Sequence, residues 1–462
     1  MPNSKLKQFG LVLAGVVTGV MLSLNFSANA DKLGAQPLPV EELRAFADVF
    51  NVVKRDYVEP VEDKKLFTQA ITGMLSGLDP HSAYLDANAL KELQVSTKGE
   101  FGGLGIEVSM EDGFVKVVSP IEDTPAFRAG IKAGDLIIKI DDILVKGMNL
   151  DEAVKRMRGK PSTRIILTLA RKGELQPIVV NLTREIIRAQ SVKSKVVEPG
   201  YGYLRVTQFQ ENTVRSVAEH LARLAKEGKP KGLVFDLRND PGGLLNGAVG
   251  VAAAFLPEGA MVVTTNGRTE GAHREYRATL GDHLQGGALR ALPPWTRDVP
   301  MVVLVNGGSA SASEVVAGAL QDHKRAQIMG TRTFGKGSVQ TILPLANAAA
   351  LKLTTARYYT PSGRSIQAKG IDPDIVVEES AQGGSAKRLR EADLQGHLGN
   401  DRDPGEAIDK VNEDKKAPES AKIELPKPFE YGSPDDYQLA QALNQLKGLP
   451  VEKVSQPEKS TP

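Results

Sequence analysis

The feature that most constrains the fold is a pattern that occurs twice: an apolar strand, two adjacent glycines, then a helix. The first copy runs from the strand Gly232–Leu237 into Arg238-Asn-Asp-Pro-Gly-Gly243. The second runs from the strand Met301–Asn306 into a glycine- and serine-rich turn, followed by a helix near Val315. Buried strands alternating with helices are typical of α/β domains. Two such turns can also aim unpaired backbone amides at one point, as an oxyanion hole requires.

The second turn presents a candidate nucleophile. Ser311 is the middle serine of Asn306-Gly-Gly-Ser-Ala-Ser-Ala-Ser-Glu314. Lys336 lies between two glycines in Gly330-Thr-Arg-Thr-Phe-Gly-Lys-Gly-Ser-Val-Gln340. A serine hydroxyl needs a base to remove its proton, and a desolvated, neutral lysine can be that base. The two segments therefore indicate a Ser/Lys hydrolase.

Three other interpretations of these residues stay open at this point. Ser311 and Glu314 match the S-x-x-E capping box, so the serine could simply cap a helix. Gly330 to Lys336 matches the start of a phosphate-binding loop, although Gly337 stands where that loop has Ser or Thr. His323 could suggest a Ser/His/Asp triad, but the G-x-S-x-G elbow is absent and the histidine lies among charged residues.

The N-terminus predicts secretion. Lys5 and Lys7 precede an apolar run, Phe9–Leu24, and then Ala28-Asn29-Ala30, which is typical of a cleavable signal peptide over residues 1–30. A retained membrane anchor is the alternative. We therefore expect a periplasmic protein, exported across the inner membrane.

Composition excludes several classes of site. The chain contains no cysteine, so disulfides, thiolate metal sites and lipidation at the cleavage point are excluded. The six histidines are scattered, and we assign no metal and no cofactor. The net charge of +2 equals the contribution of Lys5 and Lys7, so the secreted part is near neutral and nucleic acid is not expected as a partner.

The rest of the chain divides by texture. Residues 31–97 are expected to be helical, with apolar spacing at Leu43–Val53 and a second helix over Lys65–Leu75. Residues 98–188 change to short strands and turns around one helix. Residues 189–380 form the α/β region, with flanking N-terminal segments. Residues 381–462 are expected to hold helical and flexible parts, including short helices over Lys387–Leu398 and Asp435–Leu446.

The β-rich region resembles a PDZ domain. Its Gly103-Leu104-Gly105-Ile106 stands where PDZ domains have their carboxylate-binding Gly-Leu-Gly-Phe loop, and a Thr-Pro-Ala-x-x-Ala-Gly-Ile-x-x-Gly-Asp stretch follows at 124–135. Such a loop directs backbone amides at a terminal carboxylate while the bound peptide adds a strand to the sheet. A small β-domain with turn glycines is the alternative.

Taken together, the chain resembles the carboxyl-terminal processing proteases, which are tail-specific serine peptidases. The likeness covers roughly residues 35–380. It rests on Asp236-Leu-Arg-Asn-Asp-Pro-Gly-Gly243, Gly308-Ser-Ala-Ser-Ala-Ser-Glu314, Thr333-Phe-Gly-Lys-Gly-Ser-Val-Gln340 and Tyr359-Thr-Pro-Ser-Gly-Arg-Ser-Ile-Gln367. The resemblance implies an α/β multidomain fold: a crotonase-like protease core, an inserted PDZ domain, and helical N- and C-terminal arms. Asp240 departs from the family pattern, in which Asn precedes Pro-Gly-Gly.

The resemblance also implies roles for individual residues. The nucleophile falls on Ser311, the general base on Lys336, and the glutamine that orients the lysine on Gln340. The oxyanion donors fall on the amides of Ala312 and of Gly242 or Gly243. In a straight strand, Lys336 and Gln340 would lie about 13 Å apart, at ~3.3 Å per residue. Gly335 and Gly337 must therefore curve the chain, or the arrangement forms only on activation.

We therefore expect a secreted, PDZ-regulated endopeptidase that captures protein C-termini and processes or degrades envelope proteins. The resemblance further implies a homo-oligomer held by the terminal helices, and activation by substrate or an adaptor protein. Two alternatives remain: a catalytically inactive PDZ scaffold of the cell envelope, and an acyl-transforming enzyme of crotonase type. The latter would need a coenzyme A pocket, for whose phosphates no basic cluster stands out.

Overall fold

The computed structural model describes residues 38–121, 123–280, 287–346, 348–380, 388–402 and 430–452. The predicted signal peptide lies outside these ranges. The charged segment Asn400–Glu419, which is predicted to be a flexible linker, lies outside them from residue 403 onward. The chain divides into two compact units, Met1–Ala70 and Ile71–Pro462, each considered separately below. No helix among the described residues combines the length and apolar character needed to cross a membrane.

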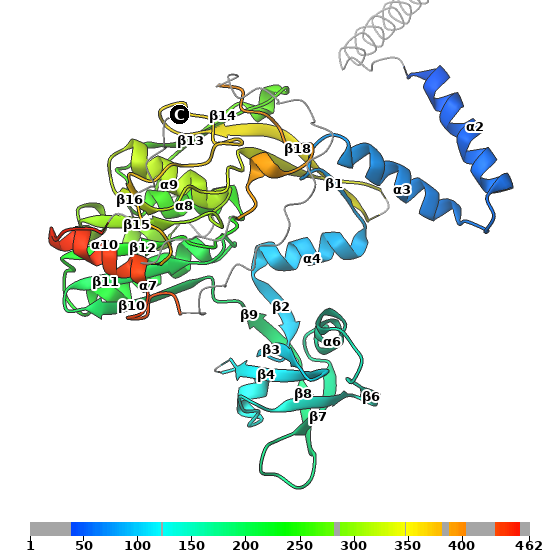
Figure 1. Ribbon diagram of the computed structural model, residues 1–462, viewed down its shortest axis with the longest axis horizontal. Helices are drawn as coiled ribbons and strands as arrows, with labels where there is room; N and C mark the ends of the chain where they lie inside the picture. Colours follow the sequence, from blue (N-terminus) through cyan, green and yellow to red (C-terminus); the bar gives the residue numbers. More distant parts are fainter. Residues whose placement is uncertain are drawn as a thin grey trace, which may run out of the picture. The chain divides into compact units, whose positions relative to one another are not determined.

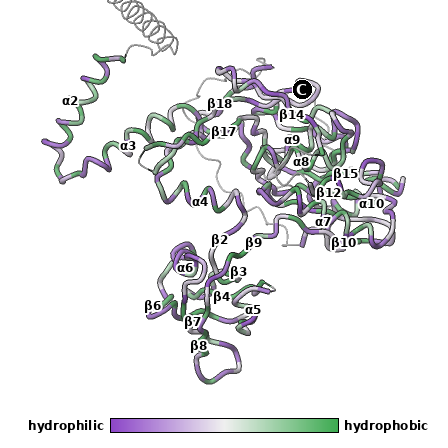
Figure 2. Tube along the Cα trace, turned by 180° about the vertical axis from the view of Figure 1, so that it is seen from behind, coloured by the Kyte–Doolittle hydropathy of each residue, from purple (hydrophilic) through white to green (hydrophobic). Residues whose placement is uncertain are grey.

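The first unit contains helix α2 (Val40–Asp56) and most of α3 (Asp63–Ser76). Phe50 packs against Phe67 with ring centroids 4.8 Å apart. Along α2, hydrophobic and hydrophilic residues alternate at helical spacing (Figure 2). None of its residues is buried, and its apolar side chains are therefore exposed: Leu43, Phe46, Val49 and Val52.

The second unit begins with the end of α3 and continues into strand β1 (Ala83–Leu85) and helix α4 (Ala87–Lys98). The Asp86 side chain caps α4, and Gly99 ends it with a φ of 69°. The expectation that residues 31–97 are helical is wrong at β1. This strand forms because it pairs antiparallel with β18 (Ala350–Tyr359), a partner too distant in sequence for local periodicity to reveal.

A PDZ-type sheet is inserted after α4. It has the strand order β3-β4-β5-β7-β8, with β6 paired to β5. Its elements, which surround a core of their own, are β3 (Ile106–Glu111), β4 (Phe114–Pro120), α5 (Pro125–Arg128), β5 (Leu136–Ile140), β6 (Ile143–Leu144), α6 (Leu150–Met157), β7 (Arg164–Ala170) and β8 (Ile178–Thr183). The chain enters along β2 (Glu100–Gly103) and leaves along β9 (Glu185–Arg188), and these two strands pair with each other.

The α/β core is a six-stranded sheet with the order β10-β11-β12-β15-β16-β19, parallel from β11 to β19. Its strands, most of which are labelled at the left of Figure 1, are β10 (Val192–Glu198), β11 (Tyr201–Val206), β12 (Gly232–Asp236), β15 (Met301–Val305), β16 (Gln327–Gly330) and β19 (Ile375–Val376). Every residue of β12 and β15 is buried, as their apolar composition predicts.

Helices cover both faces of this sheet. Phe235 belongs to the core shared with α7 (Thr213–Ala225), α8 (Leu245–Ala253) and α9 (Ala312–Asp322). Its neighbour Val234 belongs to the opposite core, which contains Leu439 and Leu443 of α10 (Tyr437–Lys447). This alternation is the two-residue period of a strand buried on both sides.

A second sheet lies around the long strand β18, in the order β1-β18-β13-β14 with β17 also paired to β18. Its other strands are β13 (Met261–Asn266), β14 (Arg274–Arg277) and β17 (Ser338–Pro344). Three 3-10 turns lie between β13 and β15: η1 (Glu270–Ala272), η2 (Ala288–Ala291) and η3 (Pro294–Arg297). The sheet joins the segment before the PDZ insertion to the strand that follows Lys336.

The two helices expected in the C-terminal part differ in how far they form. The expected helix over 387–398 is reduced, in the described residues from 388, to the single 3-10 turn η4 (Glu391–Asp393). Helix α10 forms close to the expected bounds and ends at Gly448, with a φ of 70°. Arg238 ties it to the core, because the fully buried guanidinium lies 2.6 Å from both Asp236 and Asp436.

Candidate active site

Ser311 lies at the N-terminus of α9, directly after the turn that follows β15. Its backbone has a φ of 55° and a ψ of −112°, a strained conformation for a residue with a side chain. Two hydrogen bonds of the Ser309 hydroxyl hold the turn in place: it donates to the Leu237 carbonyl at 2.8 Å and accepts from the Asn306 amide at 3.0 Å. Ser311 is thus presented by a rigid strand-to-helix turn.

Glu314 connects this turn to the lysine loop. One carboxylate oxygen accepts from the amides of Ser311 and Lys336, at 2.7 and 2.9 Å. The other accepts from the Gly335 amide at 2.7 Å and the Thr333 hydroxyl at 2.6 Å. Burial raises the pKa of Glu314 to about 7 against the effect of these hydrogen bonds. The backbones of Ser311 and Lys336 therefore share one acceptor atom.

The Lys336 side chain lies in a suitable environment for a base. Burial, followed by the nearby positive charge of Lys352, lowers its pKa to about 8, while Glu391, Glu314 and Asp79 act in the opposite direction. Lysine ordinarily titrates near ~10.4, so a much larger fraction of this amine is neutral near pH 8. Three carboxylates therefore influence this amine, but burial outweighs their effect on its pKa.

The Ser311 hydroxyl is hydrogen-bonded to the hydroxyl of Tyr358, at 2.9 Å between the oxygens. Burial raises the pKa of Tyr358 to about 12, so the phenol keeps its proton across the physiological range. Ser311 and Glu314 also form the predicted capping box at the start of α9, in which the Glu314 carboxylate accepts from the Ser311 amide at 2.7 Å. The serine therefore occupies the N-cap position, and its hydroxyl also contacts a residue outside α9.

Gln340 lies on β17, where the pairing register with β18 shifts between Val339 and Gln340. Its amide nitrogen donates to the hydroxyls of Ser338 at 3.0 Å and Thr354 at 3.2 Å. The segment between Lys336 and Gln340 is therefore not a straight strand, because β17 begins only at Ser338 and is interrupted by this bulge. Gly335, with a φ of 102°, adds a further bend before the lysine.

Glycines of the first turn approach Ser311 closely. A Cβ on Gly242 would lie 2.8 Å from the Ala312 amide nitrogen and 2.9 Å from the Ser311 Cβ. The Gly242 amide itself donates to Asp240 Oδ1 at 2.8 Å. Of the two expected glycine donors, the Gly242 amide is therefore engaged in this arrangement.

The geometry argues against the two rival chemistries. A phosphate loop needs free amides, but those of Gly335 and Lys336 donate to Glu314, and that of Gly337 donates to Gln367 at 3.0 Å. His323 lies at the opposite end of α9 from Ser311, about 18 Å away at ~1.5 Å per residue. Its ring hydrogen-bonds the Met261 carbonyl at 2.6 Å.

The predicted peptide-binding loop lies between β2 and β3. Gly103 ends β2 and Ile106 begins β3, with the buried Leu104 and Gly105 between them. Gly105 has a φ of 77°, and a Cβ there would lie 2.2 Å from Thr124. Only glycine fits this position, which agrees with its place in the motif.

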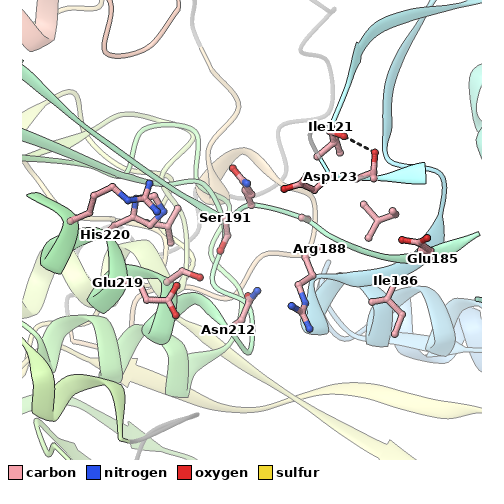
Figure 3. Close-up of a pocket in the computed structure, with 16 residues that line it drawn as sticks. Ile121, Asp123, Glu185, Ile186, Arg188, Ser191, Asn212, Glu219 and His220 are labelled. Carbon is pink, nitrogen blue, oxygen red and sulfur yellow. Dashed lines mark hydrogen bonds between the residues drawn. The ribbon is translucent and has the colours of Figure 1, made fainter. Parts of the chain in front are cut away.

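A separate cavity of about 450 Å³ lies away from Ser311. Figure 3 shows Arg188, Glu185 and Asp123 on one side and Glu219 with His220 of α7 on the other. None of the predicted site residues lines it. This cavity is therefore not the candidate active site.

Sequence reasoning missed several residues around the lysine: Tyr358, Glu314 as a connecting group, Asp79, His81, Glu391 and Gln367. Glu314 had a signal, because the capping box contains it. Asp79 and His81 follow a Gly-Leu pair that predicts only a chain break. Their proximity to the site arises from the pairing of β1 with β18.

The fold and this site together define the class: a serine peptidase with an α/β core and an inserted PDZ domain. A model described as "Peptidase family S41" matches residues 200–377, a PDZ domain model matches 102–182, and a model described as "Activating protease CtpB N-terminal domain" matches 20–89. Among similar proteins, a carboxy-terminal-processing protease of Bartonella bacilliformis is 48% identical over 83% of this chain and 87% of its own length.

A carboxy-terminal processing protease, CtpA of Bacillus subtilis, is 34% identical over 81% of this chain and 78% of its own length. Among solved structures, the photosystem II D1 C-terminal processing protease is 32% identical, covers 72% of this chain and 86% of its own, and has a TM-score of 0.41. The chain therefore belongs to the carboxy-terminal processing proteases of peptidase family S41.

Proposed function

We propose that this protease cleaves peptide bonds with Ser311 as nucleophile, Lys336 as general base and Gln340 as the residue that orients the lysine. The observation that carries the proposal is the shared acceptor oxygen of Glu314, which receives the amides of Ser311 and Lys336 at 2.7 and 2.9 Å. The lowered pKa of Lys336, about 8, supports its role as the base.

The reaction proceeds in two stages. Lys336 takes the Ser311 proton as Oγ attacks the peptide carbonyl, and the oxyanion receives hydrogen bonds from the amides of Ala312 and Gly243. Lys336 then gives the proton to the leaving amine, and an ester to Ser311 remains. Water attacks this ester as Lys336 accepts its proton. The proton returns to Ser311, and the new C-terminal carboxylic acid leaves.

The PDZ domain supplies substrates to this site. The Gly103-Leu104-Gly105-Ile106 loop would bind a terminal carboxylate, and the peptide would extend β3, which is the edge strand of its sheet in the described residues. In a relative, a PDZ domain of a carboxy-terminal protease from Vibrio cholerae, the structure holds a peptide. Amidation of a substrate's C-terminus should therefore slow its cleavage.

The cellular setting forms part of the proposal. Residues 1–30 act as a signal peptide, and the mature enzyme works in the periplasm on envelope proteins, with an adaptor protein as a possible activator. The exposed apolar side of α2, including Phe46 and Val49, supports a homo-oligomer held by the terminal helices. The core is expected to be of the crotonase-like α/β type.

The decisive experiment compares wild type with Ser311→Ala and Lys336→Ala on an unfolded protein substrate such as casein. Both variants should lose measurable turnover while keeping the wild-type melting temperature. A fluorophosphonate probe should label Ser311 in wild type only. Undiminished cleavage by Ser311→Ala would refute the assignment. A wild type that neither cleaves nor reacts with the probe would instead favour a PDZ scaffold.

A further inference from the structure

The turn Asp79–Ser82 is hydrogen-bonded to Thr354 of β18, the residue that pairs with Gln340 of β17. It leads directly into β1, which pairs with β18 (Figure 1). The Asp79 carboxylate is 4% exposed. It accepts from the amides of His81 and Ser82, at 2.8 and 2.9 Å, and from the Ser82 hydroxyl at 2.7 Å. Asp79 is therefore held rigidly by its own turn.

A further bond leaves this turn and reaches β18. The Thr354 hydroxyl donates to Asp79 Oδ1 at 3.0 Å. Burial opposes the charge of Asp79, but hydrogen bonds led by that of Ser82 outweigh it and lower its pKa, so the carboxylate is ionised and can only accept. The single proton of the Thr354 hydroxyl is therefore committed to Asp79.

This commitment determines which end of the Gln340 amide faces Thr354. A hydroxyl whose proton is already used can only accept, so Gln340 must present its NH₂ group, as observed at 3.2 Å. The same nitrogen donates to Ser338 Oγ at 3.0 Å. Both amide protons are thus engaged, and the amide oxygen is the group left to accept from a lysine amine.

The same turn is also connected to Gly337, the residue after Lys336. The His81 ring nitrogen lies 3.0 and 2.9 Å from the two carboxylate oxygens of Glu391. Glu391 accepts from the Gln367 amide at 3.0 Å, and Gln367 accepts from the Gly337 amide at 3.0 Å. Gly337 and Gln340, which both follow Lys336 in the chain, are therefore tied to this one turn.

We propose that Asp79 is a positioning residue for the general base, acting through the Thr354 hydroxyl to fix the orientation of the Gln340 amide. Without the Asp79 acceptor, Thr354 can donate to Gln340 instead, and the amide can turn over. Its NH₂ group would then face the lysine, two donors would oppose each other, and the base would be misaligned. This inference rests on the proposed function of Lys336 and Gln340.

The test measures kcat and KM of the full-length enzyme on a peptide with a free C-terminus, for Asp79→Ala, which removes the acceptor, and for Thr354→Val. We expect each to lower kcat on the order of 10- to 100-fold with little change in KM, because misplacing a catalytic group has effects of this size. Thr354→Ser keeps the hydroxyl and should restore most of kcat. The double variant should be no worse than either single one, because both break the same chain of bonds.

The pH profile separates positioning from simple loss of structure. Lys336 faces Lys352, Glu391, Glu314 and Asp79. Asp79→Asn removes one negative charge and should move the rise of kcat/KM to lower pH. Thr354→Val removes no charge and should lower kcat without moving the profile. The matched control is Asp86→Asn, which removes a carboxylate that caps α4 and should leave kcat unchanged.

The outcomes distinguish this inference from the proposed function. If Ser311→Ala and Gln340→Ala are inactive but Asp79→Ala and Thr354→Val keep the wild-type kcat, the positioning role is wrong and the catalytic assignment stands. If Gln340→Ala or Ser311→Ala is fully active, the proposed function itself fails. If Asp79→Ala does not fold, the Thr354→Val and Thr354→Ser pair decides, and equal kcat in the two overturns the inference.

Discussion

The two turns that follow β12 and β15 each contain a buried carboxylate, but these carboxylates differ in how completely they are hydrogen-bonded. In the second turn, Glu314 accepts four hydrogen bonds, two on each oxygen. In the first, Asp240 Oδ1 accepts from the Gly242 amide, while its buried Oδ2 has no partner among the described residues. Burial raises both pKa values, to about 7 and about 8.

A third buried carboxylate, that of Asp236, differs from these two because it has an arginine partner. Asp236, at the end of β12, is as deeply buried, but the charge and hydrogen bonds of Arg238 overcome the burial and lower its pKa. Asp236 therefore serves to hold the fold together. Glu314 gathers the backbone donors of Ser311 and Lys336, whereas Asp240, within the described part of the chain, leaves an unpaired acceptor beside the Gly242-Gly243 turn. The degree of hydrogen bonding, rather than burial alone, distinguishes these roles.

Among the variants below, removal of the Glu314 carboxylate is expected to lower kcat the most. Glu314→Ala leaves the amides of Ser311, Gly335 and Lys336 without their acceptor, and each buried donor left unpaired costs about 1–3 kcal/mol. We expect kcat to fall on the order of 1,000-fold and the melting temperature to drop. Steady-state kinetics and thermal unfolding measure both, and near-wild-type kcat would show that Glu314 does not organise the site.

A methyl group on the first turn should have the next largest effect. Gly242→Ala places a Cβ 2.7 Å from the Ala310 carbonyl and 2.8 Å from the Ala312 amide, at a φ of 96°. The added methyl group would displace the amide of Ala312, which is one of the proposed oxyanion donors. Because loss of one such donor costs about 100- to 1,000-fold in kcat, we expect on the order of a 100-fold loss with KM little changed. Gly113→Ala is the control, because it also has positive φ but has open space around it.

The base should impose a pH dependence on activity. Lys336 must be neutral to accept a proton, so activity is lost as the pH falls below its pKa of about 8. The neutral fraction, and hence kcat/KM, should rise about 50-fold between pH 6 and pH 8. Rates measured across this range on one peptide test the expectation. A flat profile would contradict lysine as the base.

Asp240 should act on stability in the opposite direction. Its folded-state pKa of about 8 exceeds the unfolded value near 3.8, so the native state binds more protons between these limits and stability falls as the pH rises. Asp240→Asn removes this titration and should raise the free energy of unfolding by about 1–3 kcal/mol more at pH 8 than at pH 5. Denaturant unfolding at both pH values measures the difference, and equal gains would exclude Asp240 as its source.

The smallest expected effect concerns Tyr358. Tyr358→Phe removes the partner of the Ser311 hydroxyl and retains the ring. A single neutral hydrogen bond is worth about 0.5–1.5 kcal/mol, so we expect a two- to tenfold decrease in kcat as the serine samples other rotamers. An increase in kcat would instead show that the tyrosine restrains the nucleophile in an inactive state.

Local pattern predicted much of this molecule, and long-range pairing accounts for the rest. Strands β12 and β15 and the turns after them could be predicted from the local sequence, because the apolar runs of the two strands favour burial. The role of Asp79 could not be predicted, because it depends on β1 meeting β18 more than 260 residues later in the chain. The helix expected over 387–398 is reduced, in the described residues from 388, to η4, where the Glu391 backbone amide donates to the distant Phe334 carbonyl.

The pairing of β2 with β9 has a consequence for how the PDZ domain can be exchanged. Glu100 lies opposite Arg188, and Gly103 opposite Glu185, so the two crossing points of the chain are neighbours at the usual strand spacing of ~4.8 Å. A two-residue turn could replace everything between Gly103 and Glu185 without stretching the backbone. The PDZ domain can therefore be exchanged as a unit. Recombination could remove it, or substitute another recognition module, without changing the core sequence on either side.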